Sequence, residues 1–133
     1  MNDRHRRMVE VLERHLQAER DRDLDGTMAT LIANPRYTFP NGQSITGWQP
    51  VRDFYAKIFT RWLPRVVGRN GYNRWVNDSA IAMEHETHTR LDDGSVQIDR
   101  MVIVIPFEGD LMTGELTYGT RQLGELMERI MAD

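Results

Sequence analysis

The hydrophobic and polar positions of the chain repeat with one period in its first half and another in its second half. Residues 3–22 place Met8, Leu12 and Leu16 at helical spacing, which predicts an amphipathic helix whose apolar stripe also takes in His15. From Val66 onward the period is two, which is typical of strands. The order of elements is therefore helices first and strands afterwards.

Three shorter segments precede Val66. A second helix is predicted after Asp23, with Leu31 and Ile32 on its buried side, ending at Asn34-Pro35 because the residue before a proline resists the α conformation. The segment RYTFPNGQSIT predicts two extended pieces around a Pro-Asn-Gly turn. A third helix, from about 49 to 62, is expected to end before Pro64.

Turn signals divide the second half into four antiparallel strands, and residues 120–133 predict a final helix. The turns are Asn77-Asp78-Ser79, Asp93-Gly94 and Glu108-Gly109-Asp110. Helices followed by a meander of strands indicate the α+β class. The pattern predicts one domain over residues 1–133, with the helices gathered on one face of a curved antiparallel sheet.

The stretch MEHETHTR, residues 83–90, has the alternation of a β-strand, in which successive side chains point to opposite faces. One face carries a row of ionisable side chains, Glu84, Glu86, His88 and Arg90, and the other face carries Met83, His85, Thr87 and Thr89. A two-residue Asp93-Gly94 turn would place His88 opposite Asp99 across the ladder. We further assume a three-residue loop at the next turn, Glu108-Gly109-Asp110. One face of the sheet is then apolar at one end and polar at the other. The residues at the polar end are Glu84, Glu86, His88, Asp99, Glu115 and Thr117. This register turns the ionisable row toward the pocket.

The opposite face of the same strands is predicted to be too apolar for open water, which favours a homodimer interface there. Its members are Ile81, Met83, Ile98, Val102, Val104, Met112, Leu116 and Tyr118.

Composition narrows the function classes. The 133 residues include 40% hydrophobic and 28% charged residues with a net charge of −3, which argues against nucleic-acid binding because phosphate neutralisation needs clustered cations. The absence of cysteine excludes disulfides and thiol catalysis. Neither a signal peptide nor a run of apolar residues long enough to cross a bilayer is found. We expect a soluble, cytoplasmic protein without a membrane partner.

Three segments carry a resemblance to a known family over nearly the whole chain: RDLDGTMATLIANPRYTFPNG, ITGWQPVRDFYAKIF and FEGDLMTGELTYG. Together with the order of elements they resemble the SnoaL-like and ketosteroid-isomerase-like branch of the nuclear transport factor 2-like superfamily. The resemblance implies a cone-shaped barrel in which three N-terminal helices pack on a curved antiparallel sheet and enclose a pocket. Members of the superfamily are often dimers that associate through the outer face of the sheet. The resemblance implies no single reaction, because the superfamily includes isomerases, epoxide hydrolases, dehydratases, cyclases and non-catalytic binders.

Most of the catalytic residues of that family are absent from the matching positions of this sequence. The base and the tyrosine of ketosteroid isomerases correspond to Phe39 and His15 in this sequence. The charged triad of limonene epoxide hydrolases corresponds to Glu84, Glu86 and Gly119, and Gly119 also replaces the acid on which SnoaL-type cyclases rely. Tyr37 alone matches a pocket tyrosine of the hydrolases.

The predicted cross-strand pair gives the sharpest chemical hypothesis. A carboxylate at Asp99 would orient His88 as a general base, while crowding would raise the pKa of one of the neighbouring glutamates, Glu84, Glu86 or Glu115, so that it can supply a proton. A structural ion-pair network at the rim of the sheet is the alternative for the same residues. The spacing EHETH does not match the HExxH of zinc helices, so no metal and no cofactor are predicted.

Aromatic and polar side chains are predicted to line the pocket and hold a small, largely apolar molecule. They are His15, Tyr37, Trp48, Tyr55, Trp62, Trp75, Met101, Glu115 and Thr117. The sequence leaves two functions open. One is a cofactor-independent acid/base enzyme of the isomerase, dehydratase, cyclase or epoxide hydrolase type. The other is a non-catalytic ligand-binding or dimeric interaction domain of the same fold.

Overall fold

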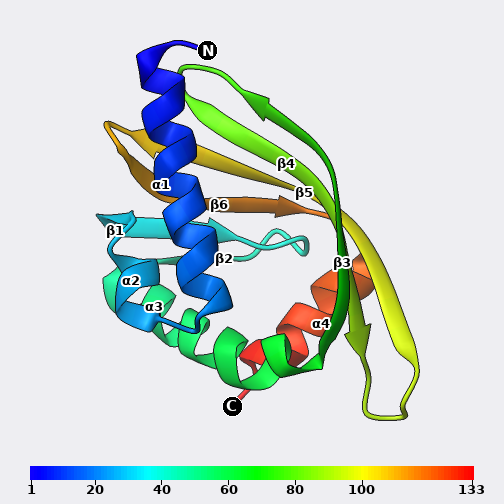
Figure 1. The fold of residues 1–133 in the computed structure, drawn as a ribbon. Coiled ribbons are helices and arrows are strands. Elements are labelled where there is room, and N and C mark those ends of the chain that lie inside the picture. Colours follow the sequence, from blue (N-terminus) through cyan, green and yellow to red (C-terminus); the bar gives the residue numbers. More distant parts are fainter.

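The computed structural model describes all 133 residues as helices gathered against one curved, open sheet (Figure 1). The helices are α1 (Asp3–Arg20), α2 (Leu24–Met28), α3 (Trp48–Lys57), which continues through a π-helical turn η1 (Ile58–Trp62) and a 3-10 turn η2 (Leu63–Arg65), and α4 (Arg121–Met131). The strands are β1 (Leu31–Thr38), β2 (Ser44–Thr46), β3 (Val66–Val76), β4 (Ala80–Arg90), β5 (Val96–Glu108) and β6 (Leu111–Tyr118). The predicted α+β class is confirmed.

The strand order is β2-β1-β6-β5-β4-β3, and every neighbouring pair is antiparallel except β1 and β6, which are parallel. The sheet is therefore mixed, where the sequence predicted only antiparallel strands. β3 lies at one edge, with β4 as its only strand partner. Figure 1 shows α1 crossing the sheet and α3 and α4 closing its lower end.

The helices begin where side chains can satisfy their free N–H groups. Asn2 accepts a hydrogen bond from the His5 backbone at 2.7 Å, and Asp23 accepts one from Gly26 at 2.9 Å. The predicted cap at Asp23 is confirmed, but the predicted length of the second helix is wrong. α2 ends at Met28, and Leu31 opens β1, which extends through Pro35 because it gains strand partners on both sides.

The β4–β5 hairpin has a different register from the predicted one. The Leu91 amide donates to the Ser95 carbonyl at 2.8 Å and the Gly94 amide donates to the Leu91 carbonyl at 3.0 Å, so the loop holds three residues instead of two. Gly94 takes a φ of +87°, which suits a glycine at the end of such a loop. Thr87 consequently lies opposite Asp99, and His88 lies opposite Ile98.

A slip of one residue exchanges the two faces of a strand, and this is what separates the predicted and observed positions of β4. The inner face of β4 carries Ile81, Met83, His85, Thr87 and Thr89, and all five are buried or line a cavity behind the helices. The predicted pocket row of Glu84, Glu86 and His88 lies on the outer face. Of the residues predicted for the dimer face, Ile81, Met83 and Met112 lie inside instead.

The β5–β6 pair keeps most of the predicted faces although its register also differs. Glu108 lies opposite Leu111 across a two-residue turn, and an irregularity farther along brings Ile103 opposite Thr117. The shift at Met112 is one residue, which turns Met112 inward, but the net shift at Thr117 is two residues, which leaves Glu115 and Thr117 on their predicted face. Asp99, Met101, Glu115 and Thr117 therefore point inward as predicted.

Gly114 permits a close approach between β6 and β1. Its φ is +138°, and it lies opposite Arg36 in the parallel ladder. A Cβ atom placed on Gly114 would lie 1.8 Å from the Arg36 carbonyl oxygen. Only glycine fits at this point of the sheet.

The core is apolar and lies between the inner face of the sheet and the helices. Its fully buried members include Met8, Leu12, Val51, Ile81, Ile105 and Met112. Every helix is too short or too polar to span a lipid bilayer.

Candidate functional site

A cavity of about 450 Å³ lies between the helices and the inner face of the sheet, a volume typical of pockets for small organic ligands. Of its 26 lining residues, 15 are hydrophobic, so the walls suit an apolar body. Its exposed lining residues lie at the end of α1 and along β3, from Arg69 to Arg74, which places the mouth between these two elements. Arg74 and Glu13 form an ion pair at 2.7 Å that bridges them.

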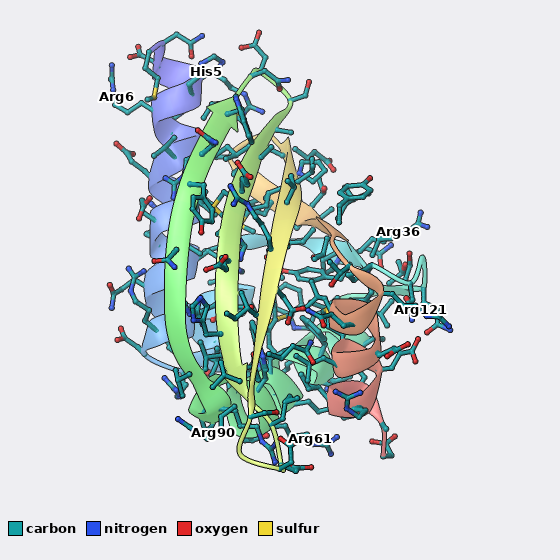
Figure 2. The ribbon with its side chains drawn as sticks, turned by 90° about the vertical axis from the view of Figure 1, so that its right-hand side faces the viewer. His5, Arg6, Arg36, Arg61, Arg90 and Arg121 are labelled. Carbon is teal, nitrogen blue, oxygen red and sulfur yellow. The ribbon has the colours of Figure 1, made fainter.

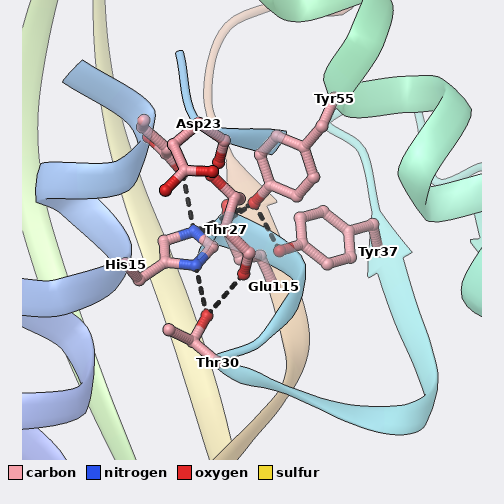
Figure 3. A network of polar contacts seen from close by, with 8 residues as sticks. His15, Asp23, Thr27, Thr30, Tyr37, Tyr55 and Glu115 are labelled. Atoms are coloured by element: carbon pink, nitrogen blue, oxygen red, sulfur yellow. Dashed lines mark hydrogen bonds and ion pairs between the residues drawn. The ribbon is translucent and has the colours of Figure 1, made fainter. Parts of the chain in front are cut away.

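A buried polar network lies against the cavity and joins α1, β1, α3 and β6 (Figure 3). His15 is completely buried, and its Nε2 atom lies 2.6 Å from Glu19 Oε1 and 3.6 Å from Glu115 Oε2. Tyr55 lies 3.0 Å from the same Nε2 and donates to Glu115 at 3.3 Å. The Tyr37 hydroxyl hydrogen bonds to that of Tyr55. All but His15 line the cavity directly.

Thr30 fixes the proton on the far side of the His15 ring. The Thr30 hydroxyl donates to the Thr27 carbonyl at 2.7 Å, so it must accept the hydrogen bond from His15 Nδ1, also 2.7 Å long. His15 therefore carries a proton on Nδ1 and directs Nε2 toward the two glutamates. This arrangement resembles the support that orients a working imidazole.

The charges of the network are coupled. Burial lowers the pKa of His15, but Glu19 and Glu115 outweigh it and raise that pKa to about 10, so the ring is an imidazolium at neutral pH. Burial raises the pKa of the Glu115 carboxyl above its ordinary value, against the opposing effect of His15. Burial also holds the pKa values of Tyr37 and Tyr55 well above their usual range. Each of these groups can hold or donate a proton next to a ligand.

His85 is a second histidine in the cavity and differs from His15 in its surroundings. It lies on the inner face of β4, opposite Met101, and its ring makes no hydrogen bond to the protein. Burial lowers its pKa and the nearby Arg69 charge lowers it further, while Glu19 acts in the opposite sense. His85 is therefore a neutral imidazole with free ring nitrogens at neutral pH. The sequence analysis assigned it to the other face.

The predicted catalytic pair was wrong, because His88 and Asp99 lie on opposite faces of the sheet. His88 contacts Glu86 at 2.7 Å, and Glu84 is held by Asn73 and Arg100 at 2.7 and 3.0 Å. A hydrogen bond from His88 lowers the pKa of Glu86, and one from Asn73 lowers that of Glu84. Glu84 borders the cavity, but its carboxylate belongs to this outer-face network.

Asp99 is fully buried and has a structural role. Its carboxylate accepts hydrogen bonds from Gln97 at 3.0 Å and from Gln122 at 3.0 Å, with Thr120 at 3.5 Å. These contacts fasten β5 to the first turn of α4. The carboxylate has no histidine to orient.

The predicted lining residues divide into two groups. Those that line the cavity are Tyr37, Tyr55, Trp62, Met101, Glu115 and Thr117, with His15 directly behind them. Trp48 and Trp75 are exposed and lie outside it, and Trp75 is on the outer face of β3 opposite Ala82. The sequence analysis missed His85 and Glu19. A helical i,i+4 spacing from His15 was the signal that could have found Glu19.

His15, Glu19 and Glu115 are the cluster whose ligand atoms could approach a metal ion, since all lie within 4.8 Å of one another. The distances fit an ion pair better. His15 Nε2 and Glu19 Oε1 are 2.6 Å apart, whereas two atoms bound tetrahedrally to zinc at about 2.1 Å would lie roughly 3.4 Å apart. The arrangement is that of an imidazolium between two carboxylates.

Solved structures share this architecture of a curved sheet with covering helices. An NTF2-like protein of unknown function from Burkholderia pseudomallei superposes with a TM-score of 0.73 at 17% identity, covering 95% of this chain and 98% of that one. The chain has the NTF2-like fold. The NTF2-like resemblance expected from the sequence is thus confirmed for the fold.

Two other solved structures of similar fold are described as proteins of very different kinds. A steroid delta-isomerase from Pseudomonas aeruginosa superposes with a TM-score of 0.73 at 12% identity, covering 94% of this chain and 88% of that one. A de novo designed protein with a curved β-sheet reaches the same TM-score at 11% identity, covering 98% and 97%. No protein-family model and no curated protein matches the sequence. The NTF2-like fold alone therefore assigns no activity.

Proposed function

We propose that the chain binds a small, largely apolar molecule in the cavity and carries out cofactor-independent acid/base chemistry on it. One observation carries this proposal. A single cavity holds His85, whose pKa burial lowers, and Glu115, whose pKa burial raises, so it contains an imidazole that can accept a proton and a carboxyl group that can hold one.

The proposed reaction begins with His85. Its neutral ring takes a proton from a carbon next to a substrate carbonyl, and the electron pair of the C–H bond moves toward the carbonyl oxygen. The protonated form of the Glu115 carboxyl, which accepts a hydrogen bond from Tyr55, donates to that oxygen and stabilises the charge on it. Return of the proton to a different carbon gives an isomer, and loss of a β-hydroxyl as water gives a dehydration product. The name of the steroid delta-isomerase neighbour fits the first outcome.

Replacing either group should abolish turnover while the fold is kept. We expect His85→Gln and Glu115→Gln each to lower kcat/KM by about 10² to 10⁴, the range for loss of a general acid or base. The assay follows the absorbance of the conjugated enone formed from a panel of β,γ-unsaturated ketones and β-hydroxy ketones. Because the pKa of His85 is lowered, the acid limb of the kcat/KM profile should fall below pH 6.5.

His88→Gln is the matched control, because His88 is a histidine of the same strand that faces away from the cavity. Its turnover should equal that of the unaltered chain. If His85→Gln and Glu115→Gln bind an apolar fluorescent probe normally but no member of the panel is ever turned over, the non-catalytic binding function replaces the catalytic one.

We also propose that a second copy of the chain covers the outer face of the sheet. The outer face of β3, β4 and β5 is turned toward the viewer in Figure 2. It exposes Ile98 by 52% and Tyr118 by 57%, and Val102 lies opposite Tyr118 with Val104 farther along β5, which makes a large apolar surface to leave in water. We expect light scattering at micromolar concentration to give the mass of a dimer. The variant Tyr118→Lys with Val104→Lys should be monomeric and folded. A monomeric unaltered chain would contradict the proposal.

A further inference from the structure

The carboxylates that line the cavity all have cationic partners, whereas two of the arginines that line it have no anionic partner. Each carboxylate has a cationic partner: Glu19 and Glu115 share His15, and Glu84 pairs with Arg100 at 2.9 Å. No carboxyl group of the lining is thus left without a cationic partner inside the protein.

The arginines at the mouth are not balanced in the same way. Arg74 is paired with Glu13, but Arg69 makes no hydrogen bond or ion pair, and Arg20 bonds only to the neutral amide of Gln17 at 2.9 Å. A chain with a net charge of −3 therefore holds two unpaired guanidinium groups at the entrance to its main cavity. Two such groups favour an anion at that position.

The surroundings of Arg69 leave room for that anion. Its guanidinium lies over the Trp62 ring, 5.9 Å from the centroid, which limits the positions that it can take. Two residues along β3, Gly71 lies opposite His85, and a Cβ atom added at Gly71 would meet nothing within 4 Å. The space between Arg69 and the unpartnered His85 ring is therefore open toward the cavity.

We propose that the ligand is an amphiphilic carboxylate, whose carboxylate group binds Arg69 and Arg20 at the mouth while its apolar body extends inward past His85 toward Tyr55 and Glu115. This rests on the proposed function only in taking the cavity as the binding site. The orientation places the apolar part against the hydrophobic walls and keeps the negative group away from Glu115. It also sets the reacting carbon between His85 and the tyrosines.

Isothermal titration with a matched pair of probes tests the ligand class. 4-Butylbenzoate and 4-butylbenzamide share size and shape and differ in charge. We expect the benzoate to bind about tenfold more tightly than the benzamide, as for charge-assisted contacts to two guanidinium groups that are partly exposed. Raising the ionic strength should reduce this preference, because the mouth is open to solvent. The double variant Arg20→Gln, Arg69→Gln should lose the preference and keep its affinity for the benzamide.

Arg36→Gln is the control, since Arg36 is an arginine outside the cavity whose side chain contacts only Ser44. It should keep the full preference. Equal affinity for the two probes in the unaltered chain, no binding of either probe, or a preference that survives in the double variant would each overturn the proposal. Glu115→Gln separates this result from the proposed chemistry, because it should stop turnover and leave the preference for the benzoate intact.

Discussion

Gly114→Ala should prevent stable folding or lower the free energy of unfolding by more than about 4 kcal/mol, a size reached only by severe steric or burial defects. The added methyl group would lie 1.8 Å from the Arg36 carbonyl oxygen, which is a backbone atom and cannot rotate away. The φ of +138° is unfavourable for alanine as well. Relief of the clash would require β1 and β6 to separate, and this would also break the contact between Tyr37 and Glu115.

Urea denaturation followed by circular dichroism measures this loss. Gly109→Ala is the matched control, because Gly109 also has a positive φ, of +61°, but open space around its Cβ position. Its cost should be only about 1 kcal/mol of backbone strain. Equal losses for the two variants would show that β1 and β6 do not approach as closely as described.

His15→Leu should destabilise the chain by roughly 3 to 5 kcal/mol at neutral pH, the cost of leaving buried charge without its partner. Leucine fills the space but strands Glu19 and Glu115 next to an apolar side chain. The double variant His15→Leu, Glu19→Gln should recover part of the loss, because the carboxylate that lies 2.6 Å from the His15 ring is gone. Chemical denaturation of the single and double variants gives both values.

The pH dependence of stability gives an independent check on His15. Its pKa rises from 6.5 to about 10 on folding, so the folded state holds the proton more tightly. The stabilisation is complete below pH 6.5 and is lost as the pH rises toward 10. The free energy of unfolding of the unaltered chain should therefore fall across this interval, and His15→Leu should lack that part of the decline. Parallel curves for the two proteins would contradict the assigned ion pair.

The repeating pattern of side chains was sufficient to predict the elements that organise the cavity. The first helix, the strand meander and the final helix follow from local periodicity, and Asp23 is identified as a cap from its side-chain chemistry. β1 was misassigned at Leu31 and Ile32 because its parallel partner, β6, lies about 80 residues away, and non-local pairing leaves no signal in a short apolar segment.

The prediction of the candidate site depended on the number of residues in a single turn, between β4 and β5. Both a two-residue and a three-residue loop place Gly94 at a positive φ, so the sequence Asp92-Asp93-Gly94 does not distinguish them. The difference of one residue moved His85 into the cavity and His88 out of it. The ordinary expectation that a row of ionisable side chains faces away from the core was correct here. Glu115 and Thr117 were placed correctly because their register differs by an even number.

The alternation of β4 also bears on how such a chain can change during evolution. His85 lines the cavity and Thr87 is buried on the same inner face, while Glu84 and Glu86 on either side of His85 belong to the opposite surface. Substitutions at odd-numbered positions of this strand can thus alter ligand selectivity, and those at even-numbered positions can alter association between copies. The two properties can diversify independently along one short segment, without an insertion or a new domain.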